Sequence, residues 1–308
     1  MADYTKLGLD EVKEILSLYS LGEVTDIAPQ GHGISNSNYK ISLADQEPVL
    51  LKVSNDKSYE ELEKEQIILK HLSQSKFQLA LTPVKTKEER LTYQIGPFTG
   101  VVYPFIEGSV PEIGTTAISQ IAQALAQLHN VKVDPSLRAH TEVGFDFQNI
   151  YDFVHTRLEC PADFQAAFDK IFPQDKSKKI LAHNLESSLI HGDLYYDNCM
   201  FYNNELVKMI DFEQSGLGPI LLDIGISISG SCLRGENLDN VLIDKFIKSY
   251  QHERKIQEIE LLNDYIHIGL FSIALWRIKR FLTGDLDPLK KYSYQQLITR
   301  SINFEHSS

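Results

Sequence analysis

Hydrophobic residues recur every three to four positions in several long stretches of the chain. Val12, Ile15, Leu16 and Tyr19, for example, would share one face of a helix that ends near Gly22. The same spacing predicts helices over residues 9–20, 58–73, 118–129, 238–250, 256–283 and 289–304, and over 146–188 with breaks at Pro161 and Pro173. Most of the chain after the first third is therefore expected to be helical.

Short runs of apolar, β-branched and aromatic residues predict strands in the first third. These runs cover residues 24–28, 39–41, 49–53, 91–95 and 100–103. The following residues, Pro104 to Gly108, break the strand pattern and suit a linker. We therefore expect an α+β protein in which residues 1–103 form one lobe, 104–109 a hinge and 110–308 a larger helical lobe.

One hairpin is predicted inside the helical part. Cys199 to Tyr202 and Leu206 to Ile210 read as two strands, and the turn pair Asn203-Asn204 lies between them. The rest of this lobe is expected to be helical.

Three polar residues flank the hairpin: Asp193 and Asn198 precede it, and Asp211 follows it. Protein groups catalyse phosphoryl transfer mainly by placement and charge neutralisation, so two acids and an amide that converge on one point suit this reaction. Asp193 would accept the proton of a substrate hydroxyl, while Asn198 and Asp211 would hold Mg²⁺ on the nucleotide phosphates. The alternative is that His191-Gly192-Asp193 is only a turn that caps a helix.

A glycine-bearing turn between the first two predicted strands is a candidate phosphate-binding loop. It includes Gly31, Gly33 and Ser35. Glycine lets backbone N–H groups approach a phosphate closely, although a plain β-turn has the same pattern.

A single lysine, Lys52, lies within the apolar strand 49–53. A buried lysine is costly unless it is paired, so this residue either binds a ligand or faces water from an edge strand. Its partner would be an acid on the next predicted helix, where Ser58 is the expected N-cap and Glu61 and Glu65 lie on one face. Either glutamate is otherwise a solvated helix charge.

Composition narrows the function classes further. The chain has 308 residues, 43% of them hydrophobic, and a net charge of −12, which argues against general binding to nucleic acid or to an anionic membrane. Its three cysteines, Cys160, Cys199 and Cys232, are widely spaced and form neither a zinc motif nor a disulfide framework. The N-terminus lacks a signal-peptide core and the apolar stretches are too short to span a bilayer, so we expect a cytoplasmic protein.

The hairpin region resembles the catalytic loop and the metal-binding triplet of protein kinases, with Gly192 in place of the arginine and Glu213 in place of the glycine. Both departures are typical of the aminoglycoside phosphotransferase and choline kinase-like family. Within it, the chain most resembles the type II homoserine kinases, in three segments: Gly33 to Tyr39, His191 to Asn198 and Ala274 to Arg277.

This resemblance implies a two-lobed protein-kinase-like fold with a small antiparallel β-sheet in the first lobe. It implies ATP and Mg²⁺ as cofactors and O-phospho-L-homoserine as the product, as in threonine biosynthesis. Lys52, paired with Glu65 or failing that Glu61, would orient the nucleotide phosphates, and backbone groups around Pro104 and Ile106 would bind adenine. The buried acid Asp223 would support the catalytic loop.

Residues that bind the acceptor are less determined by the sequence. A carboxylate on the acceptor would need a cation, for which Arg234, Arg277 and Arg280 are candidates, and an ammonium would need an acid such as Asp197 or Glu213. Choline-type acceptors would need aromatic walls, for which the candidates are Tyr195, Tyr196 and Trp276. For each of these residues the alternative is an ordinary surface or core position.

Other acceptors and other classes stay open at this point. Choline, ethanolamine, hydroxylysine and aminoglycosides are alternative acceptors, and a nucleotide-binding module without catalysis is an alternative class. A protein kinase is disfavoured, because Asp211-Phe212-Glu213 runs into Gly218-Pro219 without a long activation segment or an Ala-Pro-Glu triplet. The expected partner is a small hydroxylated molecule.

Overall fold

A computed structural model of the chain describes residues 5–31, 36–134, 137, 145–282 and 290–307. The chain divides into two compact units, Met1–Glu107 and Gly108–Ser308. The division falls inside the segment 104–109 that was expected to be a hinge. Each unit has its own fold and is described separately.

The first unit contains a five-stranded antiparallel sheet, with the strand order β1-β2-β3-β5-β4. The strands are β1 (Val24–Gln30), β2 (Asn36–Leu43), β3 (Val49–Ser54), β4 (Tyr93–Ile95) and β5 (Phe98–Pro104). β3 lies between β2 and β5, so the alternative of an edge-strand lysine at Lys52 is wrong. The strand predictions are confirmed in position; four of the strands extend by one to three residues at their ends, whereas β4 begins two residues later than predicted.

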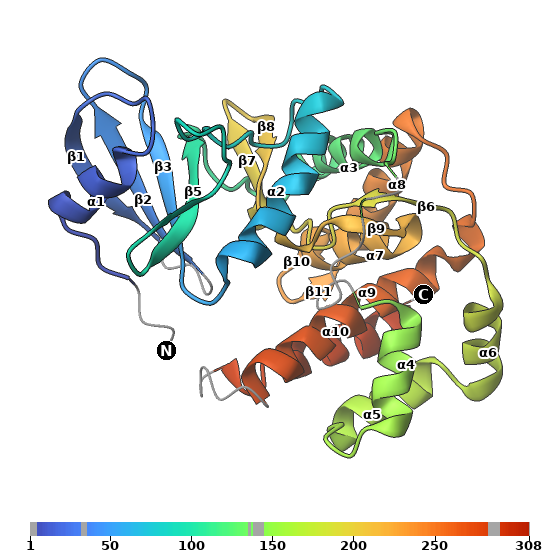
Figure 1. Cartoon of the computed structure of the whole chain (residues 1–308). Helices are drawn as coiled ribbons and strands as arrows, with labels where there is room; N and C mark the ends of the chain where they lie inside the picture. The colour runs from blue at the N-terminus through green and yellow to red at the C-terminus, as the bar shows by residue number, and fades with distance from the viewer. Residues whose placement is uncertain (1–4, 32–35, 135–136, 138–144, 283–289, 308) are drawn as a thin grey trace. The chain divides into compact units, whose positions relative to one another are not determined.

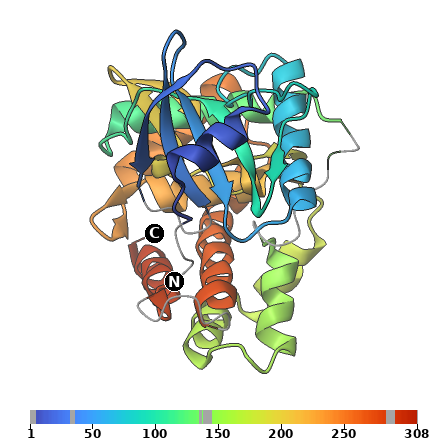
Figure 2. The ribbon, with the colours of Figure 1, turned by 60° about the vertical axis from the view of Figure 1, so that its left-hand side comes forward.

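Two helices accompany the sheet. Helix α1 (Leu9–Leu16) lies across one of its faces, as Figure 2 shows, and buries Val12 and Ile15 against Ile41 and Leu51. Helix α2 (Tyr59–Gln74) begins at Ser58, whose hydroxyl accepts a hydrogen bond from the Glu61 backbone N–H, as predicted for the N-cap.

The second unit is mainly helical (Figure 1). Its α-helices are α3 (Thr115–His129), α4 (Phe147–Thr156), α5 (Ala162–Ile171), α6 (Gln174–Ala182), α7 (Ile220–Ser231), α8 (Asn240–Glu253), α9 (Leu262–Arg277) and α10 (Tyr294–Ser307). Pro161 and Pro173 are the N-caps of α5 and α6, so the predicted breaks are confirmed. The helix expected over 256–283 is instead divided into a 3₁₀ turn at Ile259–Leu261, α9, and a π-helical turn at Ile278–Leu282. Within the described residues, none of the helices is both long and apolar enough to cross a bilayer.

The hairpin predicted in this unit is confirmed. Strands β7 (Cys199–Tyr202) and β8 (Glu205–Met209) pair antiparallel through a two-residue turn at Asn203 and Asn204. Both turn residues have positive φ, 51° and 64°, which asparagine tolerates better than most residues and which matches the twist of a hairpin.

The expectation of a lobe that is helical apart from this hairpin is wrong in two places. β6 (Ser187–Ile190) pairs with β9 (Gly216–Pro219), and β10 (Leu233–Arg234) pairs with β11 (Asn237–Leu238). Because β6 precedes the catalytic-loop sequence and β9 follows Asp211, the β6–β9 pair holds the two ends of the candidate site together. A four-residue strand carries too little alternation to be predicted from its own sequence.

Helices α7 and α9 form the centre of this unit and approach each other at two glycines. A Cβ added to Gly225 would lie 1.9 Å from the backbone oxygen of Tyr265, and one added to Gly269 would lie 2.6 Å from the Gly225 carbonyl carbon. Only glycine allows backbones to pack this closely. α7 is buried along its whole length as a result.

We expect Gly225→Ala to lower the free energy of unfolding by about 3 kcal/mol, because the added methyl forces α7 and α9 apart in a packed core. Ser227→Ala in the same helix is the control. The Ser227 hydroxyl is buried and finds no hydrogen-bond partner among the described residues, so its removal should change the stability by less than about 0.5 kcal/mol. Urea denaturation measures both; equal effects of the two substitutions would contradict the close crossing.

Candidate active site

The open end of the β7–β8 hairpin brings Asn198 and Asp211 together. Asn198 immediately precedes β7, and its carbonyl accepts a hydrogen bond from the Ile210 N–H at 2.9 Å. Asp211 is the next residue along the chain. The hairpin register therefore places the two predicted metal ligands side by side.

Asn198 also reaches back to Asp193. Its Nδ2 donates to the Asp193 backbone oxygen at 2.8 Å and lies 3.4 Å from the Asp193 carboxylate Oδ2. With the amide nitrogen engaged in this way, the Asn198 Oδ1 has no hydrogen-bond partner within the described part of the chain. The predicted base and both predicted metal ligands thus occupy one site.

Asp211 has an unusual backbone conformation. Its φ and ψ are 65° and 56°, in the left-handed region, and its side chain is exposed. Such a conformation costs about 1 kcal/mol or more for a residue other than glycine and persists where its surroundings impose it. Asp211 lies two residues after the end of β8 and turns the chain into the 3₁₀ turn Phe212–Gln214.

Acidic side chains crowd this site. Burial raises the pKa of the half-buried Asp193 well above its usual value, and the negative charges of Asp211, Asp197 and Glu213 raise it further; the hydrogen bond from Asn198 opposes them. Hard oxygen donors with excess negative charge are what Mg²⁺ prefers. The residues present therefore fit a divalent cation carrying phosphate ligands.

His191 links the catalytic loop to the segment before Asp211. Its Nδ1 accepts the Asp193 backbone N–H at 3.3 Å, so its Nε2 carries the proton donated to the Ile210 oxygen, 3.0 Å away. The ring is completely buried and packs at a tilt against Phe212. Burial lowers the pKa of His191 to about 4, in agreement with this neutral form.

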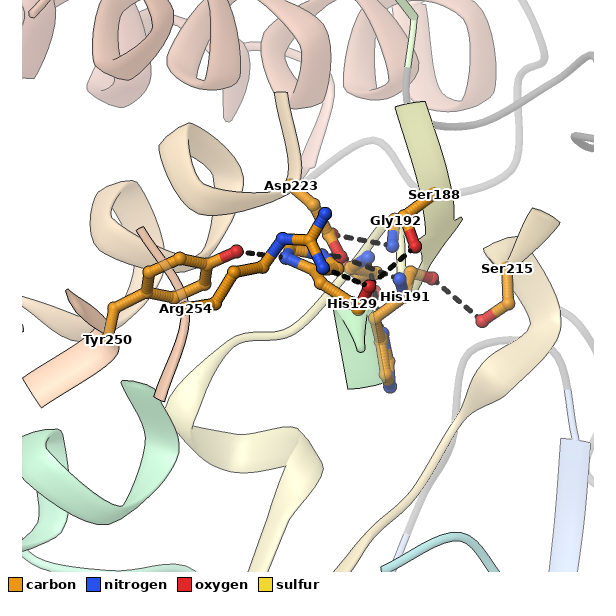
Figure 3. A network of polar contacts seen from close by, with 9 residues as sticks. His129, Ser188, His191, Gly192, Ser215, Asp223, Tyr250 and Arg254 are labelled. Atoms are coloured by element: carbon orange, nitrogen blue, oxygen red, sulfur yellow. Dashed lines mark hydrogen bonds and ion pairs between the residues drawn. The ribbon is translucent and has the colours of Figure 1, made fainter. Parts of the chain in front are cut away.

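The buried carboxylate of Asp223 holds the start of the catalytic loop (Figure 3). It accepts the backbone N–H groups of His191 at 2.7 Å and Gly192 at 2.8 Å. It also lies 3.0 Å from Nε2 of His129. Burial alone would raise the pKa of Asp223, but the hydrogen bond from His129 and the further polar contacts with His129 and His191 outweigh it and hold the pKa below its usual value.

Residues that are distant in the sequence extend the hydrogen-bond network of Asp223 beyond His129. The Tyr250 hydroxyl lies 2.7 Å from His129 Nδ1, and the His129 carbonyl accepts hydrogen bonds from Ser188 and Arg254 (Figure 3). Arg254 also forms an ion pair with Glu186. His129 is therefore structural, and Asp223 has the supporting position that the resemblance implied.

Gly192 has a positive φ of 82°, and a Cβ there would lie 2.5 Å from the Gln214 backbone oxygen. Glycine therefore suits this position, where protein kinases have arginine, for a local steric reason.

In the first unit, the two candidate glutamates have different environments. Glu61 is exposed and caps α2, since its Oε2 accepts the Ser58 N–H at 2.7 Å. Glu65 is buried and forms an ion pair with Lys57. Lys52 is half-buried on β3, opposite Asn38 and Val101. The pairing of Lys52 with Glu65 stays a prediction.

The remaining nucleotide-binding candidates lie at the ends of strands. Gly31 directly follows β1, whereas Gly33 and Ser35 lie outside the described residues. Pro104 is the last residue of β5. Ile106 is half-buried, and its backbone N–H and C=O make no hydrogen bond within the described part of the chain, so both are available to a ligand.

The candidate acceptor-binding residues have different surroundings, and the charges of Asp197 and Glu213 act on Asp193. The Tyr195 ring lies against Gly230 of α7, where an added Cβ would be 2.0 Å from the ring. Trp276 packs edge-on against Phe281, and Arg280 lies over its ring. Arg234 is 81% exposed and pairs with Asp239, and its role toward an acceptor stays a prediction.

Sequence reasoning missed one buried arginine. Arg300 of α10 is 7% exposed, and its side chain donates to the backbone oxygens of Ser229 and Glu236. A signal existed: this arginine lies among the core positions Leu297 and Phe304 of an amphipathic helix, where a charge is unusual.

Comparison with known proteins defines the class of the molecule. Residues 26–259 match the phosphotransferase enzyme family, and the chain belongs to this family. Among its relatives, a homoserine kinase of Polaromonas naphthalenivorans is 26% identical over 95% of this chain and 94% of its own length. One of Agrobacterium fabrum is 24% identical over 85% and 81%.

Solved structures share the fold at low sequence identity. An amicoumacin kinase in complex with AMP-PNP and Ca²⁺ superimposes with a TM-score of 0.70, at 14% identity over 97% of each chain. A microcompartment-associated aminopropanol kinase gives 0.70 at 15% identity, over 97% of this chain and 98% of its own. The predicted α+β, two-lobed protein-kinase-like fold is confirmed.

We expect Asp223→Asn to lower the free energy of unfolding by about 3 kcal/mol or more, because the amide NH₂ would face backbone N–H donors in a buried site. Tyr250→Phe removes one neutral hydrogen bond at the edge of the same network and should cost about 1 kcal/mol. Urea unfolding of the two variants measures the difference. An Asp223→Asn variant as stable as the wild-type protein would show that the carboxylate does not hold the loop.

Proposed function

We propose that the chain is an ATP- and Mg²⁺-dependent kinase that phosphorylates the hydroxyl of a small metabolite, with L-homoserine as the first candidate acceptor. The observation that carries the proposal is the convergence of Asp193, Asn198 and Asp211 at the open end of one hairpin. Phosphoryl transfer needs such a base beside oxygen ligands for the metal and little other covalent chemistry.

The chain's own groups have distinct roles in this proposal. Asp193 orients the acceptor hydroxyl and takes its proton. Asn198 Oδ1 and Asp211 hold Mg²⁺, which when bound neutralises charge on the phosphates. His191 keeps the two segments in register without carrying charge.

Residues of the first unit would hold the nucleotide. Lys52 would contact the α- and β-phosphates, with Glu65 as its positioning residue, and the turn that begins at Gly31 would supply backbone N–H groups. The free backbone groups of Ile106 suit the polar edge of adenine. The AMP-PNP and Ca²⁺ of the structurally similar amicoumacin kinase support a nucleoside triphosphate with a divalent cation.

The similar proteins differ in the acceptor that their names give. Two sequence relatives at 26% and 23% identity are named homoserine kinase, whereas structural neighbours include an aminopropanol kinase and an ethanolamine kinase. All these acceptors are small amino alcohols, and they differ in whether they carry a carboxylate. Homoserine is therefore the first acceptor to test.

The first measurement is ADP release by the purified protein with Mg-ATP and a panel of acceptors. The panel contains L-homoserine, choline, ethanolamine, hydroxylysine, an aminopropanol, N-acetylhexosamines and an aminoglycoside mixture. We expect the highest kcat/KM with L-homoserine. Turnover of another acceptor would replace the substrate and keep the reaction class, whereas ATP binding without turnover of any acceptor would favour a non-catalytic module.

Two substitutions test the assigned roles. We expect Asp193→Asn to lower kcat at least about 100-fold while nucleotide affinity changes little, because only proton transfer is affected. Asp211→Ala should weaken nucleotide binding in the presence of Mg²⁺ much more than in its absence. Steady-state kinetics and calorimetric titration measure these effects, with the exposed Asp244→Asn as a matched control. Full activity of either site variant would refute the assignment.

A further inference from the structure

Tyr195 lies at the point where the catalytic loop meets the end of α7. Its backbone N–H donates to the Asp193 oxygen at 2.9 Å, and its hydroxyl is 3.4 Å from the Ser229 Oγ. Ser229 donates its own hydroxyl proton to the Ile226 oxygen, so the tyrosine hydroxyl is the donor in this contact. Tyr195 thus connects the candidate base with the C-terminal end of α7.

Two arginines reach the same corner from other helices. Arg300 of α10 donates its Nη1 to the Ser229 oxygen at 3.0 Å and its Nε to the Glu236 oxygen at 2.7 Å. Arg277, the last residue of α9, donates to the Ser293 oxygen at 2.9 Å. Both guanidinium charges lower the pKa of the Tyr195 phenol, whereas the Asp193 carboxylate raises it. The two guanidinium groups repel each other.

Neither cation has a carboxylate in direct contact among the described residues, although the negative charge of Glu236 acts on Arg300. Across the described residues, the hydrogen bonds of Arg277 and Arg300 go to backbone carbonyls, and neither guanidinium forms an ion pair with a carboxylate. Burial lowers the pKa of Arg300, and the positive charge of the neighbouring Arg277 lowers it further. Both effects disfavour the charged form of Arg300. A buried or half-buried charge normally has an anionic partner.

The guanidinium groups also have donors to spare. Each has five N–H bonds in a planar fork that matches a carboxylate, and among the described residues the backbone contacts use only one of those of Arg277 and two of those of Arg300. Arg277 is half-buried, Arg300 is 7% exposed, and neither contributes to the buried polar atoms that lack a partner within the described part of the chain.

Resting on the proposed function, we infer that Arg277, Arg300 and the Tyr195 hydroxyl form a subsite for a carboxylate of the acceptor. The acceptor is then an amino acid with a side-chain hydroxyl, and not a cationic amino alcohol. The subsite lies beside the loop of Asp193, so a short hydroxyalkyl chain would connect the bound carboxylate with the hydroxyl that is phosphorylated.

Acceptor pairs that differ only by a carboxylate test this inference. L-Homoserine is compared with 3-aminopropan-1-ol, and L-serine with ethanolamine, by kcat/KM and by calorimetric titration in the presence of Mg-AMP-PNP. We expect the wild-type protein to prefer the carboxylate-bearing member of each pair.

The variants are Arg277→Gln and Arg300→Lys. Each should lower kcat/KM for L-homoserine about 10- to 100-fold, mostly through KM, as expected for a lost hydrogen bond to a charged group. The effect on 3-aminopropan-1-ol should be much smaller, so the preference itself collapses. Arg300→Lys keeps the charge and loses the planar fork, and thermal unfolding shows whether its fold is retained.

Arg234→Gln is the matched control, because this arginine is exposed and paired with Asp239. If Arg300→Lys fails to fold, Arg277→Gln decides, since Arg277 makes one hydrogen bond within the described residues. A preference that survives in Arg277→Gln, or that falls equally in Arg234→Gln, would overturn the subsite.

The outcomes also separate this inference from the proposed function. Equal or faster turnover of the amino alcohols by the wild-type protein would overturn the carboxylate subsite and leave the kinase intact. Carboxylate-dependent binding without ADP release would keep the subsite and overturn the kinase. Neither binding nor turnover of any pair would overturn both.

Discussion

The buried carboxylate of Asp223 is the contact on which the candidate site depends. Two consecutive backbone N–H groups, those of His191 and Gly192, donate to it, and His129 closes the remaining side. A carboxylate without hydrogen bonds would be very costly at complete burial, so the charge and the loop stabilise each other. The loop conformation that positions Asp193 is therefore imposed from inside the helical unit.

The same unit gathers negative charge where the chemistry is proposed. Asp193 and Asp211 repel each other, and the cost appears as the raised pKa of Asp193. The left-handed conformation of Asp211 adds strain at the same place. The electrostatic cost would fall if a cation bound between these oxygens, whereas the backbone strain of Asp211 is held by the surrounding structure. His191 contributes structure here without charge, because burial keeps it neutral.

What the sequence predicted correctly is largely local. The hairpin, its asparagine turn and the positions of Asn198 and Asp211 follow from a few consecutive residues. What it missed depends on contacts between distant residues: His129 meets Asp223 across 94 positions, and Arg300 meets Ser229 across 71. Periodicity places such residues on a helix face but cannot say which helix they face. The short strand pairs escaped prediction for a related reason, since each is stabilised only by its partner.

The net charge of the whole chain and the local charge beside Tyr195 have opposite signs. A net charge of −12 suggests a cationic acceptor, yet Arg277 and Arg300 make the corner beside Tyr195 positive. Acidic side chains surround Asp193, which precedes Tyr195 by two residues. An amino acid acceptor carries both signs, so its carboxylate and ammonium would be drawn to opposite ends of this region and its hydroxyl held in a defined direction. A polycation would gain from the acids but would have to approach two arginines. Local charge is thus the better guide to the acceptor, because fields between exposed groups are screened beyond about 10 Å whereas partly buried charges are not.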